Sequence, residues 1–310
     1  MEKLNVQSRK ENPMRIVTRP DFDGIVCAAL LYDAEEIDRP IRWAEPNELQ
    51  KGFVEIFEGD IIANLPYHPN CAIWFDHHVT NRPDTPFMGL YKLAPSAAGL
   101  IYEYYRKKFQ RNYDELIHQT DRIDSADLTL DEVLAPEKYP YVLLSMTVSG
   151  RDDAEEPYWN HLIQLIRRHD IDAVMADPEV KRQCARVIAQ NKSFTGILKE
   201  NTRLQGHVTI TDFRSLEKVP NGNRFLVYSL YPEAVVSVRI RYDGRERRRV
   251  VIGVGHSIFN LNCRVNVGLM LTRFGGGGHR GAGSCTVPAE AAEVCLESIL
   301  ATLTANEAND

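Results

Sequence analysis

Two carboxylates lie close together near the start of the sequence, in a pattern that could bind a metal ion. Asp21 and Asp23 are separated by one residue, precede Gly24, and follow the apolar run 14–18. Carboxylates this close repel each other unless a cation offsets their charge, and their oxygens suit a divalent ion. An acidic turn that caps the following helix would give the same pattern, and the motif alone does not decide between the two interpretations.

A second motif joins a carboxylate to two imidazoles. Asp76, His77 and His78 follow the apolar run 71–75, which has the composition of a buried strand. Imidazoles and carboxylates are common ligands of divalent metals, although a strand end with one histidine buried in the core would look alike. Because both motifs follow expected parallel strands, they can converge on one pocket at the carboxyl ends of those strands.

A third motif is rich in glycine and ends in two basic residues. Gly275, Gly276, Gly277 and Gly278 are followed by His279 and Arg280. Without Cβ atoms, the backbone N–H groups of such a segment can point at an anion, and the two side chains add charge-assisted donors. A flexible linker is the other interpretation, but linkers seldom end in His-Arg between an apolar helix and a strand. The motif predicts a phosphate-binding loop.

Alternating strands and helices predict a parallel sheet in the first part of the chain. Strands are expected over four apolar runs, 14–18, 41–44, 60–63 and 71–75, and helices over 25–35 and 96–108. Strands that alternate with helices favour an α/β fold with a parallel sheet, whose functional groups gather at the carboxyl ends of the strands.

The sequence pattern changes near residue 206. From about residue 131 to 202 it is mainly helical, and we interpret a helix over 180–198 as a connector. Beyond residue 206, β-rich runs predict strands, over 207–213, 224–230, 234–242 and 249–254. We therefore expect two domains, 1–195 with a parallel sheet and 206–310 as a smaller mixed-sheet α/β domain.

Composition and charge narrow the classes of function. The 310 residues carry a formal net charge of -6, with 44% hydrophobic and 26% charged residues. This acidic balance argues against non-specific coating of DNA, which needs a basic surface, but it leaves room for a local positive site. The six cysteines form no CxxC pair, and no segment reaches the length of a membrane span. We expect a cytoplasmic protein without membrane contact.

Taken in order, these features resemble the DHH superfamily of phosphoesterases, which includes RecJ exonucleases, family II pyrophosphatases, nanoRNases and some cyclic-dinucleotide phosphodiesterases. The resemblance rests on the motifs at 21–24 and 76–78 and on the segment 94–98, Ala-Pro-Ser-Ala-Ala, which opens a helix. The motif at 275–280 is similar to the glycine-rich signature of the DHH-associated domain, whose loop grips the phosphate or nucleotide of the substrate. The similarity extends from about residue 14 to 303.

The resemblance implies a set of metal ligands and catalytic groups. Asp21, Asp23 and His77 match ligand positions of the family, and a further aspartate is expected after the Asp-His-His triplet. Asp121 is our first choice for that position and Asp124 the second. Asp76 and His78 are expected to assist proton movement and orientation, while residues 275–280 hold the substrate.

Two positions depart from the family pattern. Arg19 stands where the first motif normally begins with a metal-binding histidine, and a guanidinium has no lone pair to offer. The second family motif is a bridging aspartate at the carboxyl end of the strand before the triplet. Asp60 opens that strand and Asn64 follows its end, about 13 Å further along at about 3.3 Å per residue. We therefore place Asn64, a neutral and weaker ligand, in the bridging position.

These departures predict a site with one divalent ion rather than two. Mn²⁺ is the expected ion, with Mg²⁺ as the alternative, bound by Asp23, His77 and Asp121. Arg19 can then replace the missing metal electrostatically by clamping a phosphate bidentately. Asp21 either pairs with Arg19 or still contacts the metal.

Three functional hypotheses follow from the resemblance. The first is metal-dependent hydrolysis of a phosphoester or phosphoanhydride in a small nucleotide, a short single-stranded oligonucleotide or polyphosphate. The second is a non-catalytic protein that binds nucleotide or polyphosphate through a degraded two-metal site. The third is a structural subunit with a vestigial site. The sequence leaves the substrate, the ion and the oligomeric state open, a homodimer included.

Overall fold

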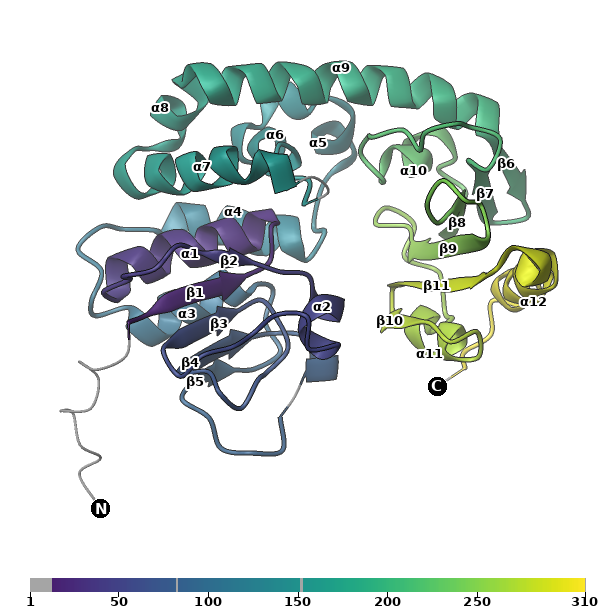
Figure 1. The fold of residues 1–310 in the computed structure, drawn as a ribbon. Coiled ribbons are helices and arrows are strands. Elements are labelled where there is room, and N and C mark those ends of the chain that lie inside the picture. Colours follow the sequence, from purple (N-terminus) through teal and green to yellow (C-terminus); the bar gives the residue numbers. More distant parts are fainter. Residues whose placement is uncertain (1–12, 82, 151–152, 310) are drawn as a thin grey trace. The chain divides into compact units, whose positions relative to one another are not determined.

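A computed structural model of the chain describes residues 13–81, 83–150 and 153–309, in two compact units (Figure 1). The first unit comprises Met1–Asp127 and Tyr139–Ala185, and the second comprises Leu128–Lys138 and Arg186–Asp310. The division falls within one long helix, α9 (Pro178–Asn201), which includes the segment interpreted above as a connector. The domain limits expected from the sequence stay a prediction, and residues 1–12 and 310 lie outside the described ranges.

The first unit is built on a five-stranded sheet in which all pairings are parallel. Its strands are β1 (Arg15–Thr18), β2 (Arg42–Trp43), β3 (Asp60–Ala63), β4 (Ile73–Asp76) and β5 (Gly89–Tyr91), in the order β2-β1-β3-β4-β5. This confirms the parallel α/β architecture expected from the sequence. The three-residue strand β5 was not predicted, because it is too short to give a periodic pattern.

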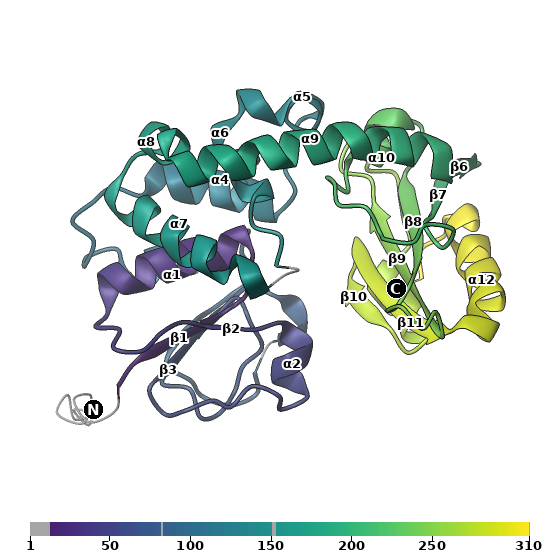
Figure 2. The same cartoon turned by 45° about the horizontal axis from the view of Figure 1, so that its top comes forward.

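Helices cover one face of this sheet (Figures 1 and 2). Helices α1 (Phe22–Ala34) and α3 (Ala97–Tyr105) contact its strands. Further helices pack on these two or on one another, namely α4 (Asp114–Asp124), α6 (Pro140–Met146), α7 (Glu156–Arg168) and α8 (Ile171–Ala176). Helix α1 is buried on nearly every side, because it contacts the sheet, α3, α4 and α7. Its sequence is apolar all round, which is typical of an enclosed helix.

The other face of the sheet is closed by the short helix α2 (Pro46–Gln50) and by loops. Val17, Ile62 and Trp74 stand in one row across β1, β3 and β4 and pack against apolar loop residues. Two further tryptophans, Trp43 and Trp159, meet edge to face at 5.3 Å between ring centroids. The first unit therefore has apolar packing on both faces of a parallel sheet, as such sheets require.

The strand register brings three chain segments to one edge of this sheet. Thr18 pairs with Ala63, and Ala63 pairs with Phe75, so Arg19, Asn64 and Asp76 each follow a residue of the same row. Asp60 lies at the opposite end of β3, where its buried carboxylate pairs with Arg15 at 2.6 Å. The rise along the strand thus separates Asn64 from Asp60 as expected.

The second unit contains a separate six-stranded mixed sheet, which confirms the expected second α/β fold. Its strands are β6 (Thr202–Gln205), β7 (Val208–Asp212), β8 (Val236–Tyr242), β9 (Arg249–His256), β10 (Gly277–His279) and β11 (Ala282–Pro288). The order is β10-β11-β9-β8-β7-β6, with β7 and β8 parallel and the other pairs antiparallel. Helices α11 (Val267–Thr272) and α12 (Ala292–Ala305) contribute to its apolar core.

One strand predicted for this unit is wrong. The run 224–230 forms a short helix, α10 (Leu226–Leu230), rather than a strand. Its apolar side chains belong to a cluster with Phe194 of α9, Phe213, and Val133 of α5 (Leu130–Leu134). The β-favouring residues of the run are thus satisfied by burial in that cluster, which overrides their intrinsic preference.

The glycine-rich segment is more ordered than the predicted loop. Gly275, with φ +68°, and Gly276 donate their N–H groups to carbonyls of Thr272 and Leu271, and so cap α11. Gly277–His279 then form β10 at the edge of the sheet, paired with β11. The first two glycines of the motif are therefore not available as anion donors, which corrects the expectation for them.

The glycines of this segment differ in whether the fold requires them. A Cβ on Gly278 would lie 2.3 Å from the carbonyl oxygen of Ala282, and the φ of Gly278 is +147°. A Cβ on Gly276 would meet Ser284 O at 2.3 Å. A Cβ on Gly277 would have no other described atom within 4 Å, apart from those of its chain neighbours. The fold itself therefore accounts for Gly276 and Gly278 but not for Gly277.

We expect the neighbouring substitutions Gly278→Ala and Gly277→Ala to differ sharply in stability. Gly278→Ala should lower the free energy of unfolding of the second unit by about 2–4 kcal/mol, because it adds a clash and an unfavourable φ. Gly277→Ala should change it by about 0.5 kcal/mol or less. Hydrogen exchange of β11 amides would measure both, and equal protection in the two variants would contradict the packing described here.

Candidate functional site

Three side chains from different elements meet at the carboxyl edge of the parallel sheet. Asp23 comes from the first turn of α1, His77 from the end of β4, and Asp124 from the last residue of α4. One ligand atom from each lies within 4.8 Å of the others. His77 Nε2 is 3.4 Å from an oxygen of Asp124 and 4.0 Å from an oxygen of Asp23. Such a cluster of nitrogen and oxygen atoms has the composition of a divalent-metal site.

The orientation of His77 is fixed by the backbone. Its Nδ1 lies 2.9 Å from the carbonyl oxygen of Ala94, and since a carbonyl can only accept, Nδ1 carries the proton. In the neutral ring the lone pair is then on Nε2, which is buried and has no hydrogen-bond partner among the described residues. This is the usual arrangement of a metal-binding histidine, whose other nitrogen is held by a hydrogen bond.

Asp23 is a buried carboxylate held by the start of a helix. Its two oxygens accept hydrogen bonds from the N–H groups of Ala97 and Ala98, at 3.0 and 2.9 Å, in the first turn of α3. Burial raises the pKa of Asp23; a positive charge on His77, when that ring is protonated, and the two N–H groups oppose that shift, and Asp21 adds to it. The segment 94–98 therefore supplies both a hydrogen bond to His77 and the N–H groups that bind Asp23.

The structure favours Asp124 over Asp121 as the third member of this group. Asp121, our first choice, accepts a hydrogen bond from the Ser96 hydroxyl at 2.5 Å and lies outside the cluster. Asp124 lies beside His77 instead. The two aspartates are three residues apart on α4, so they share one helix face, and spacing along the sequence could not separate them.

Asp76 organises the triplet that follows β4. Its fully buried carboxylate accepts hydrogen bonds from His78 Nδ1 and from Asn81 Nδ2, each at 2.7 Å, and from the N–H of His77 at 2.9 Å. Burial lowers the pKa of His78, but the hydrogen bond to Asp76 and the negative charges of Asp76, Asp23 and Asp21 together outweigh this and raise it. Asp76 therefore holds His78 in one orientation and favours its protonated form.

Arg19 and Asp21 form an ion pair next to this group. Arg19 Nη1 lies 3.3 Å from an oxygen of Asp21. The other oxygen of Asp21 accepts from the N–H of Gly24, so Asp21 also caps α1, and from Asn64 Nδ2 at 3.0 Å. Asp21 is absent from the described clusters of ligand atoms. The geometry thus favours pairing with Arg19 over the expected metal contact.

Asn64 lies at this edge as expected, in a strained but tolerated conformation. Its φ is +56°, a region in which asparagine is one of the few acceptable side chains. Because Asp21 can only accept, the group facing it is the NH₂ of Asn64. The carbonyl oxygen of Asn64 then points elsewhere, and it is buried without a hydrogen-bond partner in the described part of the chain.

Glu45 is a member of the site that the sequence did not indicate. Its carboxylate accepts a hydrogen bond from Arg19 Nε at 3.2 Å. It lies 26 residues from Arg19, at the start of α2, and no motif marks it. Burial lowers the pKa of Arg19, but the neighbouring carboxylates, Asp21 first, outweigh this and raise it.

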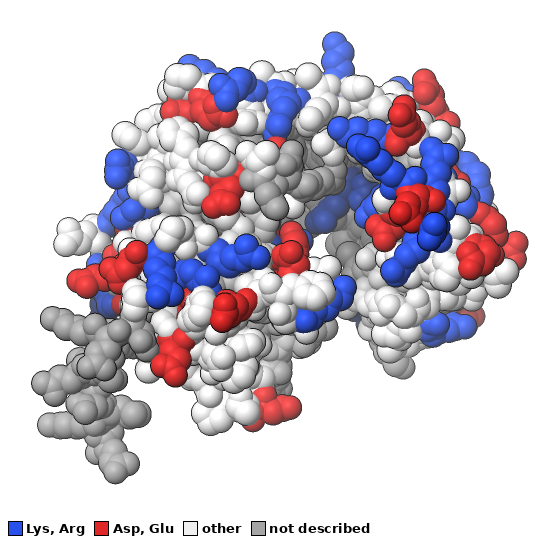
Figure 3. Space-filling model, in the orientation of Figure 1, with Lys and Arg blue, Asp and Glu red and all other residues white. Residues whose placement is uncertain are grey.

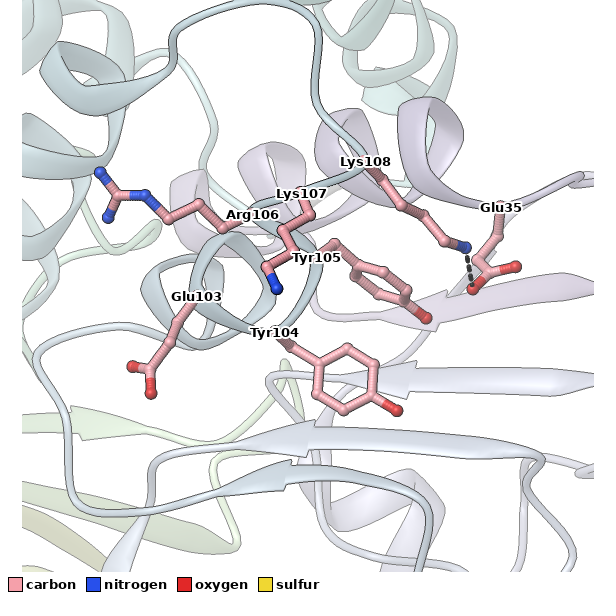
Figure 4. Close-up of a pocket in the computed structure, with 7 residues that line it drawn as sticks. All are labelled: Glu35, Glu103, Tyr104, Tyr105, Arg106, Lys107 and Lys108. Carbon is pink, nitrogen blue, oxygen red and sulfur yellow. Dashed lines mark hydrogen bonds and ion pairs between the residues drawn. The ribbon is translucent and has the colours of Figure 1, made fainter. Parts of the chain in front are cut away.

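Other surface features lie apart from this site. A hollow of about 600 Å³ at the end of α3 is lined by residues 103–108 and Glu35, none of which is a candidate ligand (Figure 4). In the second unit, the β8–β9 turn exposes Arg245 and its basic neighbours, and Arg248 pairs with Glu246. Figure 3 shows basic and acidic side chains interspersed over that unit, as in a solvated surface. No helix in the described ranges could span a membrane.

Comparisons with known proteins place the chain in a family. No family model and no curated protein matches it. Among solved structures, it is similar to the pGpG-specific phosphodiesterase PggH from Vibrio cholerae, with 32% identity and a TM-score of 0.77 over 95% of this chain and 100% of the other. The chain belongs to the DHH superfamily of phosphoesterases.

More distant DHH structures share the fold. RecJ from Thermus thermophilus, in complex with Mn²⁺, has 12% identity and a TM-score of 0.60 over 96% of this chain and 53% of that chain. An exopolyphosphatase-related protein from Bacteroides fragilis has 12% identity and a TM-score of 0.54, with 99% of both chains covered. The resemblance inferred from the motifs is confirmed.

The Mn²⁺ affinities of Asp124→Asn and Asp121→Asn should show which of the two aspartates is the metal ligand. Asp124→Asn should weaken Mn²⁺ binding by at least about tenfold, since it removes a charge next to His77 Nε2. Asp121→Asn keeps an oxygen for the Ser96 hydroxyl and should change the affinity by less than about threefold. Electron paramagnetic resonance titration of Mn²⁺ measures both, and a larger loss for Asp121→Asn would restore our first choice.

Proposed function

We propose that this chain hydrolyses the phosphodiester bond of a short linear dinucleotide such as pGpG, in a site that uses one divalent ion. The observation that carries the proposal is the group of Asp23, His77 and Asp124, in which the Nε2 lone pair of His77 is buried, oriented and unpartnered among the described residues. The similarity to PggH over nearly the whole of both chains supports pGpG as the substrate to test first. Hydrolysis of pGpG consumes one water and releases two molecules of GMP.

The residues present fit a divalent ion. Two buried polar atoms of the site, His77 Nε2 and the carbonyl oxygen of Asn64, have no hydrogen-bond partner in the described ranges. Both are of the kinds of atom that bind a divalent ion through a lone pair. We assign Asp23, His77 and Asp124 as its holders, with Mn²⁺ as the first ion to test and Mg²⁺ as the second. A divalent ion held there supplies Lewis-acid activation of water and of a phosphoryl oxygen.

The remaining groups bind and orient the substrate. Asp76 fixes the ring of His78, which we propose as the donor of a proton or hydrogen bond to the substrate. Arg19, beside the ion site, offers a guanidinium to a phosphoryl oxygen. Because Arg19 is already flanked by two carboxylates, it adds a directed donor rather than a net positive charge.

The later part of the glycine-rich segment is the candidate phosphate-binding element of the second unit. Gly277 is free of any packing requirement, so its lack of a side chain leaves the backbone open to a ligand. Gly277, Ser284 and Gly253 follow one another across β10, β11 and β9, and none carries a bulky side chain. We propose that Gly277 and Gly278, with His279 and Arg280, contact the substrate.

A second candidate function is binding of nucleotide without hydrolysis. It is favoured by one observation: Asp21 is paired with Arg19 and Asn64 and is absent from the described ligand groups, so fewer groups are left to hold metal than the resemblance implies. If the remaining donors hold the ion but do not activate water, the chain would bind pGpG and release it unchanged.

Turnover of pGpG decides between these functions. The full chain with Mn²⁺ or Mg²⁺ should convert pGpG to GMP, measured by chromatography, and Asp124→Asn should lower the rate by at least about 100-fold. A pentaribonucleotide and polyphosphate should react more slowly than pGpG. Tight binding of pGpG with no GMP formed would establish the non-catalytic function, and neither binding nor turnover would refute both.

The number of ions can be changed by restoring the family residues. The double substitution Arg19→His with Asn64→Asp should raise the metal content from one toward two ions per chain, because it supplies a ligand and a bridging carboxylate. Asn64→Asp alone should do less, since it places a second carboxylate against Asp21 while Arg19 remains. Metal analysis by mass spectrometry measures the content. Two ions in the native protein would contradict the proposed one-ion site.

A further inference from the structure

The guanidinium of Arg19 is held on two sides by carboxylates from different elements. Nε donates to Glu45 at 3.2 Å, and Nη1 lies 3.3 Å from Asp21. Nη2 has no acceptor within residues 13–81, 83–150 and 153–309. Two of the three nitrogens are therefore paired with carboxylates, and the side chain keeps 39% of its surface exposed.

Glu45 is itself fixed by its surroundings. It is the residue before α2, and its N–H donates to the Glu48 carboxylate at 2.8 Å in a capping box. Gly150, with φ +62°, packs beside it, since a Cβ there would lie 3.5 Å from the Glu45 carboxylate and 2.6 Å from Pro20 O. The backbone of the Arg19–Pro20 turn and the carboxylate of Glu45 thus contact the same glycine.

We propose that Glu45 is a positioning residue, which holds Nε of Arg19 so that Nη2 is presented to a non-bridging phosphoryl oxygen of the substrate. This inference rests on the proposed function of the site. An arginine side chain has several rotatable bonds, and a donor acts on a transition state only when it is held in the correct place. Asp21 contacts one end of the guanidinium, and Glu45 contacts the other.

The charges around Arg19 indicate which kinetic parameter depends on Glu45. One cation lies between two carboxylates, so the three residues together carry excess negative charge and do not attract an anion by themselves. Removal of Glu45 should therefore leave the capture of substrate little changed. It should instead reduce the rate of the chemical step, because Nη2 is no longer held in place.

A double-mutant cycle on the metal-loaded full chain tests the proposal. Arg19→Met should lower kcat for pGpG by about 100-fold and Glu45→Ala by about tenfold, with KM changed by less than about threefold for Glu45→Ala. In the Arg19→Met background, Glu45→Ala should cost nothing further, because it acts through Arg19. Glu45→Gln keeps an acceptor for Nε and should stay within about threefold of the native rate. Glu36→Ala, at an exposed site, is the matched control.

Two further measurements separate positioning from other roles. Glu45→Ala should keep the Mn²⁺ affinity within about twofold of the native value, since Glu45 is not in the ligand group. A loss of affinity above about tenfold would show that Glu45 is a metal ligand instead. Additive losses in the cycle, or Glu45→Gln as impaired as Glu45→Ala, would overturn the proposal.

If the native chain binds pGpG without hydrolysing it, the proposed reaction fails and the cycle is measured in the dissociation constant of pGpG. In that case no chemical step depends on Arg19, and Glu45 can position it only for binding. The positioning role is then upheld if Glu45→Ala weakens binding only while Arg19 is present, and it is overturned if the losses are additive or absent. If the native chain neither binds nor hydrolyses pGpG, the proposed function and this inference both fall.

Discussion

The buried carboxylate of Asp23 is the constraint on which the arrangement of the first unit depends. A charge without access to water is costly unless hydrogen bonds or an opposite charge compensate it. Here the start of α3 supplies two N–H groups, and the adjoining segment supplies the carbonyl that orients His77. The beginning of α1, the beginning of α3 and the end of β4 are therefore tied to one another at a single anionic group.

The same electrostatic requirement explains how Arg19 is accommodated at this edge of the sheet. The edge of the sheet gathers several carboxylates, and each cation there reduces their mutual repulsion. Arg19 is permanently charged and brings its own donors, so it offsets one of the two negative charges of Asp21 and Glu45 without an exchangeable ion. Asn64 contributes as well, because its NH₂ donates to Asp21 where a carboxylate would repel it.

The sequence predicted most where a local pattern determines the structure. The parallel sheet followed from alternating apolar runs, and the position of Asn64 followed from the rise along a strand. The choice between Asp121 and Asp124 could not be made from the sequence, since residues three apart share a helix face and differ only in what the fold brings opposite them. Glu45 could not be predicted at all, because its contact with Arg19 exists only once β1 and α2 are in place. The glycine-rich segment was misread as a loop because the backbone contacts that demand glycine come from β11.

The distribution of aromatic residues makes the two units spectroscopically distinct. All three tryptophans, Trp43, Trp74 and Trp159, lie in the first unit, and each is buried. The second unit absorbs and emits through tyrosine and phenylalanine alone. Emission excited at wavelengths where tryptophan dominates the absorption is thus an intrinsic optical label for the unit that carries the acidic site. Tryptophan emission therefore reports the unfolding of the first unit. Unfolding of the second unit can be followed in the same sample by a signal that does not come from tryptophan, and no added dye is needed.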